Sequence, residues 1–207
     1  ESEPGRCLVM VPTDAQRTMR TYLGISQKLN SDDVNEDVIS QSKITYLEGY
    51  LWDLDDAQVA IKKATKVAKE NNKIVAFRVS DVLCIERFQE SFLSLINEEA
   101  DIIFANEEEI KSLLGTSDLD ESINIIKDRN KIFAITLGEN GAMIINNEEV
   151  IKIEPQKIDN LVDTTGAGDL FAAGFLLKYI QGQPLEECGK EGVKFASKVI
   201  QIYGARL

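Results

Sequence analysis

A short stretch near the C-terminal end of the sequence combines the residue types that phosphate chemistry needs. Asp163-Thr164-Thr165-Gly166-Ala167-Gly168-Asp169 stands between an extended segment (157–162) and an apolar run (170–177) that suits a buried helix. Its two glycines allow a tight turn, and the first amides of a helix have no intrahelical acceptor and carry the positive end of its dipole. The stretch therefore predicts an anion cradle at Gly166, Ala167 and Gly168, beside a carboxylate, Asp169, that could accept a proton.

The same stretch also has a purely structural interpretation. Asp is favoured in a first helical turn because of the helix dipole, and Gly-rich turns before helices are common. On these residues alone the two interpretations are equally supported. The sequence has no histidine, so the acid and base candidates are carboxylates, Lys, Tyr and Cys, which makes Asp169 more prominent.

Two further candidates directly follow predicted strands. Thr136-Leu137-Gly138-Glu139-Asn140-Gly141 could cradle nucleotide phosphates, although a β-turn between paired strands uses the same glycines. Asn106-Glu107-Glu108-Glu109 begins a predicted helix, where Asn is a good N-cap and Glu suits the dipole even with no ligand present. A single well-placed Glu is nevertheless enough for Mg²⁺, which keeps several of its waters. Both stretches therefore have a functional and a structural interpretation.

The elements that must position these stretches alternate between strands and helices. Strands are predicted at 7–11, within 13–24, and at 44–50, 74–79, 101–105, 132–137, 142–145 and 150–153. Helices are predicted at 32–42, 55–72, 86–97, 106–115, 119–129, 166–180 and 185–202. This order predicts an α/β doubly wound domain with a mainly parallel sheet, helices on both faces, and ligands at the carboxyl ends of the strands.

Composition and charge exclude several function classes. With 23 basic and 35 acidic residues the net charge is -12, so nucleic acid and anionic membranes are not expected partners. The longest apolar runs are too short to span a bilayer, and no secretion signal opens the sequence. Three scattered cysteines and no histidine argue against a disulfide framework, a zinc site or a His-dependent triad, and free thiols suit a cytoplasmic location. The Walker-A and protein-kinase motifs are absent.

The stretch from 163 to 169, followed by a small apolar helix, strongly resembles the C-terminal signature of the ribokinase-like (PfkB) family of sugar and nucleoside kinases. The resemblance implies that Asp169 is the catalytic base. It also implies that the amides of Gly166, Ala167 and Gly168 form an anion hole for the migrating phosphoryl group. The fold that it implies is the ribokinase-like α/β fold with part of a small β lid.

The resemblance extends to the other two stretches and to ions. It implies an ATP site formed by Asn106, Thr136, Gly138 and Gly141. Glu109 would hold Mg²⁺ through water. Asp163 and Thr165 would help bind a K⁺ ion beside the anion hole, although Asp163 could equally be a turn-forming Asx residue.

Residues 14–19, Asp-Ala-Gln-Arg-Thr-Met, resemble a segment of adenosine-kinase-like members of the family that belongs to a small lid sheet near the substrate. An ordinary hairpin is the alternative. The resemblance implies a partial lid at residues 1–25, a catalytic and nucleotide-binding domain at 26–207, and a homodimer formed through the lid. Nothing before Glu1 corresponds to the family's N-terminal part with its Gly-Gly sugar-binding motif, so we expect a truncated chain.

We therefore expect an ATP-dependent kinase that phosphorylates a hydroxymethyl group of a sugar or nucleoside. Residues 14–19, Ser80-Asp81 and Glu48-Gly49-Tyr50 favour an adenosine-like substrate, with ribose or fructose as alternatives. A nucleotide-binding remnant without catalysis and an α/β interaction domain with coincidental motifs are the other hypotheses. ATP binding that depends on Mg²⁺ separates the first two from the third, and turnover in the complete protein separates the first from the second.

Overall fold

A computed structural model describes residues 3–12, 17–147 and 149–207 of the chain. Contacts between residues divide the chain into two compact units. Unit 1 comprises residues 1–26, 136–144 and 151–207, and unit 2 comprises residues 27–135 and 145–150. Strands form a six-stranded sheet and a separate two-stranded sheet. The mainly parallel α/β sheet with a small additional sheet, expected from the sequence, is confirmed.

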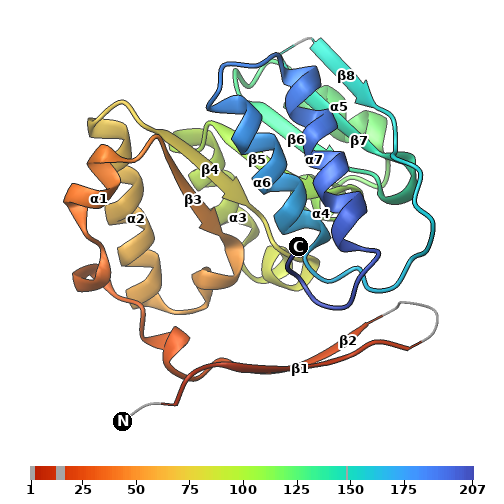
Figure 1. Cartoon of the computed structure of the whole chain (residues 1–207). Helices are drawn as coiled ribbons and strands as arrows, with labels where there is room; N and C mark the ends of the chain where they lie inside the picture. The colour runs from red at the N-terminus through yellow and green to blue at the C-terminus, as the bar shows by residue number, and fades with distance from the viewer. Residues whose placement is uncertain (1–2, 13–16, 148) are drawn as a thin grey trace. The chain divides into compact units, whose positions relative to one another are not determined.

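Unit 2 is built from parallel strands that alternate with helices (Figure 1). Its strands are β3 (Ile44–Glu48), β4 (Ile74–Arg78), β5 (Ile102–Asn106) and most of β6 (Ile132–Thr136). Its helices are α1 (Glu36–Gln41), α2 (Asp55–Glu70), α3 (Val82–Glu98), α4 (Glu107–Leu114) and α5 (Leu119–Ile126), with short 3₁₀ helices at Ser31–Asp33 and Gly49–Asp53. The strand β4 pairs in parallel with β3 on one side and with β5 on the other.

The core of unit 2 explains why its strands are continuous apolar runs. Phe77 in β4 lies beside Leu47 of β3 and Ile103 of β5, and all three side chains are buried. Parallel strands are covered on both faces, so consecutive residues rather than alternate ones must be apolar. The helix α2 packs on β3 and β4 with alanines such as Ala60 and Ala68, whose small side chains let the helix approach the sheet.

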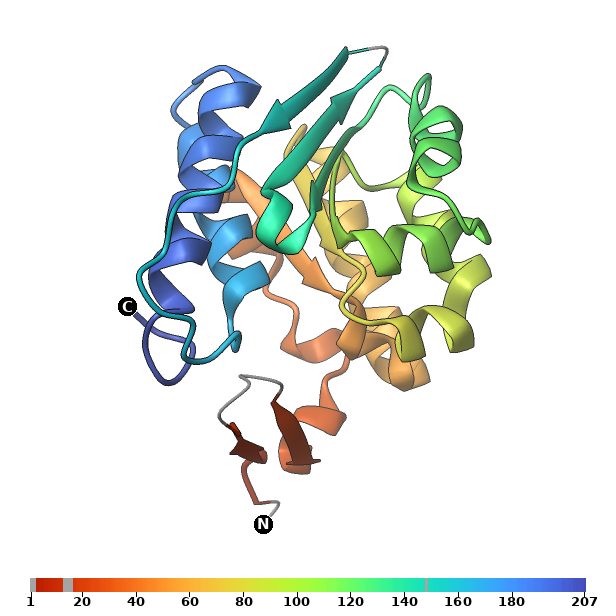
Figure 2. The ribbon, with the colours of Figure 1, turned by 90° about the vertical axis from the view of Figure 1, so that its right-hand side faces the viewer.

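Unit 1 combines a hairpin, a loop and a pair of helices. The hairpin pairs β1 (Arg6–Met10) with β2 (Thr18–Tyr22), and the helices are α6 (Ala167–Tyr179) and α7 (Leu185–Val199). Both ribbon views show α6 and α7 side by side (Figures 1 and 2). They approach closely at Gly174, where a Cβ atom would lie 2.6 Å from the Glu191 carbonyl oxygen. Residues of both units form β7 (Ala142–Asn146) and β8 (Glu149–Ile153), and the large sheet has the order β3-β4-β5-β6-β7-β8.

Two helices begin at other residues than expected from the sequence, because polar side chains cap them. The helix α3 begins at Val82, four residues before the expected start at 86, because the Asp81 side chain accepts a hydrogen bond from the Cys84 amide at 2.7 Å. The segment 32–42 forms a 3₁₀ turn and then α1, each capped by its own Asn, Asn30 and Asn35. Capping by Asp81, Asn30 and Asn35 therefore determines where these helical segments begin.

Two expected extended segments differ from the observed strands. The second strand expected within 13–24 is β2, and the expected residues Thr13, Asp14, Ala15 and Gln16 lie outside the described part of the chain. The extended segment 157–162 belongs to no strand, since β8 ends at Ile153 and the residues from 154 to 164 are irregular. The stretch from 163 to 169 therefore follows a loop and not the end of a strand.

Candidate active site

A glycine caps α6, as expected from the sequence. Gly166 is the N-cap of the helix and has φ 80° and ψ 0°, the left-handed conformation in which glycine carries no steric penalty. Gly166 also has no room for a side chain, because a Cβ atom there would lie 2.7 Å from the Ala205 Cβ. Asp169 is exposed in the first turn of α6. The turn thus places a carboxylate within one helical turn of the positive end of the helix dipole.

The three predicted anion-hole amides are not equivalent. The Ala167 amide donates a hydrogen bond to the Thr164 carbonyl oxygen at 3.2 Å, which closes the turn. The amide of Gly168 belongs to the first turn of α6, where amides lack intrahelical acceptors. Gly168 is therefore a stronger candidate donor to an anion than Ala167.

Asp163 is a buried carboxylate that ties the turn together. Its Oδ1 accepts hydrogen bonds from the Thr165 amide at 2.8 Å and the Thr165 hydroxyl at 2.6 Å, and its Oδ2 accepts from the Gly204 amide at 3.0 Å. Burial by itself raises the pKa of Asp163, but the donors of Thr165 and Gly204 outweigh burial and hold the pKa below its ordinary value. The Asx-turn alternative therefore accounts for Asp163 without an ion.

Arg17 contacts the turn before α6, which the sequence did not indicate. Its Nη1 donates a hydrogen bond to the Thr164 hydroxyl at 2.5 Å, across 147 residues of sequence. Arg17 directly precedes β2, so the hairpin contributes a cation to the turn before α6 within unit 1. The sequence placed Arg17 in a lid-like segment but gave no signal of the residue that it contacts.

The loop between β6 and β7 contains two glycines with different roles. Gly141 has φ 84°, and a Cβ atom there would lie 2.1 Å from the Ile153 carbonyl oxygen, so packing alone requires glycine. Gly138 has φ 59°, and a Cβ atom there would meet nothing within 4 Å. The Leu137 amide also donates to the Gly141 carbonyl oxygen at 2.9 Å, as in a turn between neighbouring strands. The structural interpretation thus explains Gly141, whereas the open surface at Gly138 is where a phosphate could approach.

Asn106 and Glu109, which lie in unit 2, cap the start of α4. The Asn106 amide donates to Glu109 Oε2 and the Glu109 amide donates to Asn106 Oδ1, each at 2.8 Å. Glu109 is 4% exposed. Burial raises its pKa to about 7, against the opposing effects of the Asn106 amide and the Arg78 guanidinium. A carboxylate that has given one oxygen to a cap keeps its other oxygen for a metal-bound water, so Glu109 fits the expected Mg²⁺ role.

A polar cluster at the carboxyl ends of β3 and β4 lies near Glu109 and was only partly foreseen. Glu48 and Arg78 end these strands and are partners in the parallel register. Ser80 is 3% exposed, has φ 78°, and donates its hydroxyl to Glu48 Oε2 at 3.1 Å. The Tyr50 hydroxyl donates to the Ser80 carbonyl oxygen at 3.3 Å. Strained backbone of this kind is concentrated at functional sites, and the carboxyl end of a parallel sheet is the ligand side.

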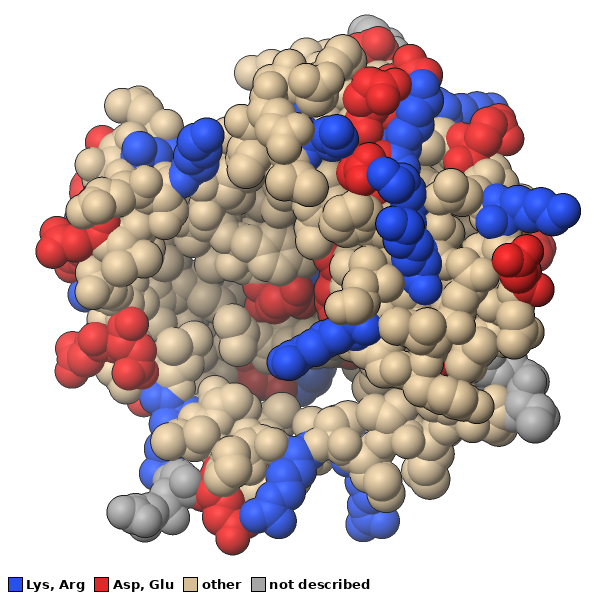
Figure 3. Space-filling model, viewed as in Figure 1, with Lys and Arg blue, Asp and Glu red and all other residues tan. Residues whose placement is uncertain are grey.

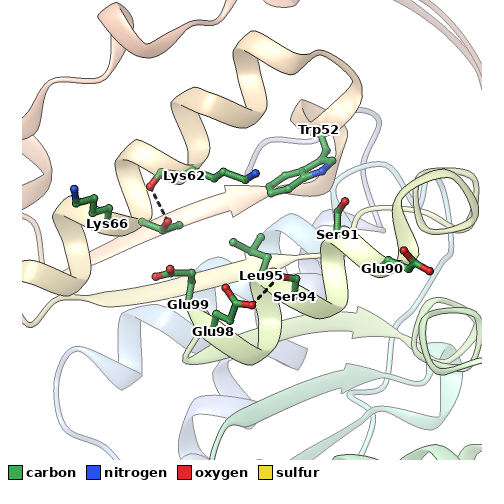
Figure 4. Close-up of a pocket in the computed structure, with 10 residues that line it drawn as sticks. Trp52, Lys62, Lys66, Glu90, Ser91, Ser94, Leu95, Glu98 and Glu99 are labelled. Atoms are coloured by element: carbon green, nitrogen blue, oxygen red, sulfur yellow. Dashed lines mark hydrogen bonds between the residues drawn. The ribbon is translucent and has the colours of Figure 1, made fainter.

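A cavity of about 610 Å³ lies elsewhere in unit 2, between α2 and α3 (Figure 4). Trp52 lies at one end of it, with Lys62 and Lys66 on α2 and Glu90 and Glu98 on α3. The Trp52 Nε1 atom is buried and has no hydrogen-bond partner among the described residues. None of the predicted site residues lines this cavity.

Charge and membrane features of the described residues agree with the composition. Acidic and basic side chains are mixed on the face shown in Figure 3, which carries no broad basic area. Among the helices within the described ranges, none is both long and apolar enough to cross a membrane. Within those same ranges, no group of three or more His, Cys, Asp or Glu residues is placed to hold a metal ion. Any Mg²⁺ at Glu109 would therefore depend on water and substrate oxygens.

Comparison with known proteins gives the family. The model of the pfkB family carbohydrate kinases matches residues 1–207. A probable sugar kinase from Rhizobium etli CFN 42 (43% identity) and the adenosine kinase from Sinorhizobium meliloti (40% identity) are solved structures with TM-scores of 0.95, each matched over 98% of this chain and 62% of its own. An uncharacterized sugar kinase from Archaeoglobus fulgidus is 38% identical over 105 residues, which are 51% of this chain and 42% of that protein.

This chain thus spans less than two thirds of the length of these relatives. The family match covers every residue of it, including the turn before α6, the β6–β7 loop and the start of α4. The chain belongs to the pfkB family of carbohydrate kinases.

Proposed function

We propose that this chain carries the catalytic residues of an ATP-dependent kinase that phosphorylates a hydroxymethyl group of a sugar or nucleoside. The observation that supports this proposal most is the turn before α6. There a left-handed Gly166 is the N-cap of the helix and an exposed Asp169 lies in its first turn. A helix start of this kind stabilises a phosphoryl group, and the adjacent carboxylate can accept the proton of an attacking hydroxyl.

In the proposed reaction Asp169 is the general base. The acceptor hydroxyl loses its proton to the Asp169 carboxylate while its oxygen forms a bond to the γ-phosphorus of ATP. The bond between that phosphorus and the oxygen leading to the β-phosphate breaks, and ADP leaves with the electron pair. Phosphoryl transfer needs little covalent help from protein, so alignment and electrostatic stabilisation supply most of the rate increase.

The anion hole is assigned to the amides of Gly166, Ala167 and Gly168. Two observations support it: Gly166 is the N-cap of the helix, and the Asp163 and Arg17 side chains form hydrogen bonds to the preceding turn. Fixed amides cost no reorganisation when negative charge develops on the transferring group. Because the Ala167 amide already closes the turn, we assign the largest share to Gly168.

The nucleotide is assigned to the β6–β7 loop and the start of α4. The Thr136 hydroxyl and the amides near Gly138 and Gly141 would contact phosphate oxygens, and Asn106 is also assigned to the nucleotide. Glu109 would hold Mg²⁺ through water, and that ion would neutralise charge on the phosphates when bound. The buried, capped position of Glu109 supports this assignment because it fixes the direction of the carboxylate.

The acceptor is assigned as adenosine-like, with ribose or fructose as the alternatives. Tyr50 supports a nucleoside, because this residue is 54% exposed in the 3₁₀ helix that follows β3 and its hydroxyl donates to the Ser80 carbonyl oxygen. A fixed, exposed aromatic ring is a stacking surface for a base. The matched relatives include proteins named adenosine kinase and cytidine kinase.

Residues 1–25 are assigned as part of a lid beside the catalytic domain at 26–207. Leu8, Met10 and Met19 on the hairpin are 62%, 47% and 45% exposed. Exposed apolar side chains on a two-stranded sheet support an interaction in which a partner protein covers the hairpin. We assign a second copy of the chain as that partner. The cysteines are free, with Cys84 and Cys188 buried, which supports the cytoplasmic location.

The test is a pair of measurements on the complete protein. Calorimetric titration with ATP is expected to show binding that requires Mg²⁺. An assay of ADP release with adenosine, ribose and fructose is expected to show turnover that is fastest with adenosine. Binding without turnover on any acceptor would leave the remnant without catalysis as the function, and no Mg²⁺-dependent binding would reject both nucleotide hypotheses.

A further inference from the structure

The cavity between α2 and α3 has the size of a small-molecule site (Figure 4). Its volume is about 610 Å³, and such sites in proteins measure about 300–1,000 Å³. The ten lining residues come from the 3₁₀ helix at Gly49–Asp53, from α2, and from α3 with the residue that follows it. All of these elements belong to unit 2, so a single compact unit forms the lining of the cavity.

The two helical walls of the cavity carry opposite charges. Lys62 and Lys66 lie one helical turn apart on α2. Glu90 and Glu98 lie on α3, and Glu99 directly follows it. A ligand with only negative charge would be repelled by the carboxylates, and a ligand with only positive charge would be repelled by the lysines. A ligand that carries both charges matches both walls.

Most of these charged side chains have no opposite charge bound to them within the protein. Lys66 is paired, since its Nζ lies 3.8 Å from the Glu70 carboxylate. The other charged side chains of the cavity form no salt bridge with a described residue; they are Lys62, Glu90, Glu98 and Glu99. A cation on one wall and carboxylates on the other therefore keep their capacity to bind a ligand.

Trp52 closes one end of the cavity and provides a hydrogen-bond donor that is not used. This residue is 2% exposed, and its Nε1 atom is buried without a partner among the described residues. Its ring packs edge-to-face against Phe92, with the ring centroids 5.9 Å apart, which fixes its position. The Lys62 side chain points toward Trp52 (Figure 4). This end of the cavity thus offers an ammonium group and an N–H donor to one acceptor group, and a buried donor without an acceptor is unfavourable.

We propose that this cavity binds a free α-amino acid with an apolar side chain. The carboxylate of the amino acid would lie at the end of the cavity formed by Lys62 and Trp52, and its ammonium group would lie against the carboxylates of α3. The apolar side chain would contact Leu95, which lines the cavity between these groups. The proposal does not rest on the kinase function, because it uses none of the residues assigned to catalysis or to the nucleotide.

Calorimetric titration of the complete protein with three compounds tests the match of charges. L-leucine carries both charges, L-leucinamide carries only the ammonium group, and N-acetyl-L-leucine carries only the carboxylate. L-leucine is expected to bind, and each derivative is expected to bind at least about tenfold more weakly, because one wall then lacks its partner. Absence of L-leucine binding at concentrations up to about 10 mM, or equal affinity for either derivative, would overturn the proposal.

Variants of the two walls show whether L-leucine binds in this cavity. Lys62→Gln neutralises the cation of one wall, and Glu90→Gln combined with Glu98→Gln neutralises the other wall, all at exposed positions where the fold is expected to stay intact. Each change should weaken L-leucine binding by at least about tenfold. Glu86→Gln is the matched control, because Glu86 is exposed one turn before Glu90 on α3 and does not line the cavity. Wild-type affinity in the wall variants as well as in the control would overturn the proposal.

Fluorescence of Trp52 gives a second measurement that does not depend on the wall variants. Trp52 is the only tryptophan in these 207 residues, and L-leucine itself does not fluoresce. Saturating L-leucine is expected to change the emission of the protein, and Trp52→Phe is expected to abolish that change. Unchanged emission in a protein that binds L-leucine by calorimetry would place the ligand outside this cavity and overturn the proposal. Neither measurement uses kinase activity, so a failure of the proposed function would leave both results interpretable.

Discussion

Asn106 and Glu109 cap each other, since the Asn106 amide donates to Glu109 Oε2 and the Glu109 amide donates to Asn106 Oδ1. In this capping box one carboxylate oxygen of Glu109 accepts a backbone hydrogen bond and so helps to cap the helix. The residue assigned to Mg²⁺ is therefore also the residue that starts α4. A substitution must preserve the cap if the charge is to be tested separately.

Glu109→Gln preserves the cap and removes the charge, and it is expected to flatten the dependence of stability on pH. Burial raises the Glu109 pKa from 4.5 to about 7, so the folded state holds this proton more tightly than the unfolded state does. The free energy of unfolding of the wild type therefore falls as pH rises from about 4.5 to 7, by on the order of 3 kcal/mol from this residue. Urea unfolding of both proteins in metal-free buffer at pH about 5 and about 8 measures the difference.

The matched control is Glu108→Gln, because Glu108 is exposed in the same helical turn. It is expected to keep the wild-type slope. Equal slopes for the wild type and Glu109→Gln would contradict the buried position of the Glu109 carboxylate.

The two glycines of the β6–β7 loop are expected to respond differently to the same substitution. Gly141→Val places atoms against the Ile153 carbonyl oxygen, so it should destabilise the fold by on the order of 3 kcal/mol. Gly138→Val meets open space and costs only the left-handed backbone conformation, about 1–2 kcal/mol, but it obstructs phosphate and should weaken MgATP binding at least about tenfold. Thermal unfolding and calorimetric titration measure the two effects.

Gly138→Asn is the control, because Asn tolerates a positive φ with a smaller strain. It should recover most of the stability that Gly138→Val loses. Unchanged MgATP affinity in a folded Gly138→Val protein would count against assigning the nucleotide to this loop.

The hydrogen bond from Arg17 to Thr164 is expected to appear as coupling in a double-mutant cycle. Arg17→Met and Thr164→Val each remove the bond, so the double variant should lose little more kcat/KM than either single one. The expected coupling is about 1 kcal/mol. Additive losses would show that the two side chains act independently.

Activity is expected to be indifferent to replacing K⁺ with tetramethylammonium. Both Asp163 oxygens accept hydrogen bonds from Thr165 and Gly204, and the Asx turn accounts for its burial. The change in kcat should stay below about twofold, which corresponds to a change of less than about 0.5 kcal/mol in the activation free energy. Activity that is lost in the organic cation and restored by K⁺ would contradict this expectation and support the ion site at Asp163 and Thr165.

Local sequence signals predicted most of the fold. Apolar runs such as 74–79 and 101–105 correctly predicted β4 and β5. A strand that is buried on both faces is a continuous run of apolar residues, which is easy to recognise in a sequence. The glycine-rich stretch located the start of α6, and Asn106 located the start of α4. In each case the signal lies within the few residues that form the element.

Long-range contacts were not predictable from the same signals. The bonds of Arg17 to Thr164 and of Gly204 to Asp163 join residues 147 and 41 positions apart, and no local pattern specifies such partners. The polar cluster around Ser80 depends on the parallel register of β3 and β4, which sequence order alone does not fix. The packing that buries Glu109 raises its pKa, and the distant Gly204 amide helps to lower the pKa of Asp163.

The kinase account depends most on Asp169, which is exposed in the first turn of α6. Asp169→Asn keeps the size of the side chain and removes the proton acceptor. In the complete protein, kcat with the best acceptor should fall by about 10²- to 10⁴-fold while the Kd of MgATP changes little. A near-normal kcat would contradict the assignment of Asp169 as general base and with it the proposed mechanism.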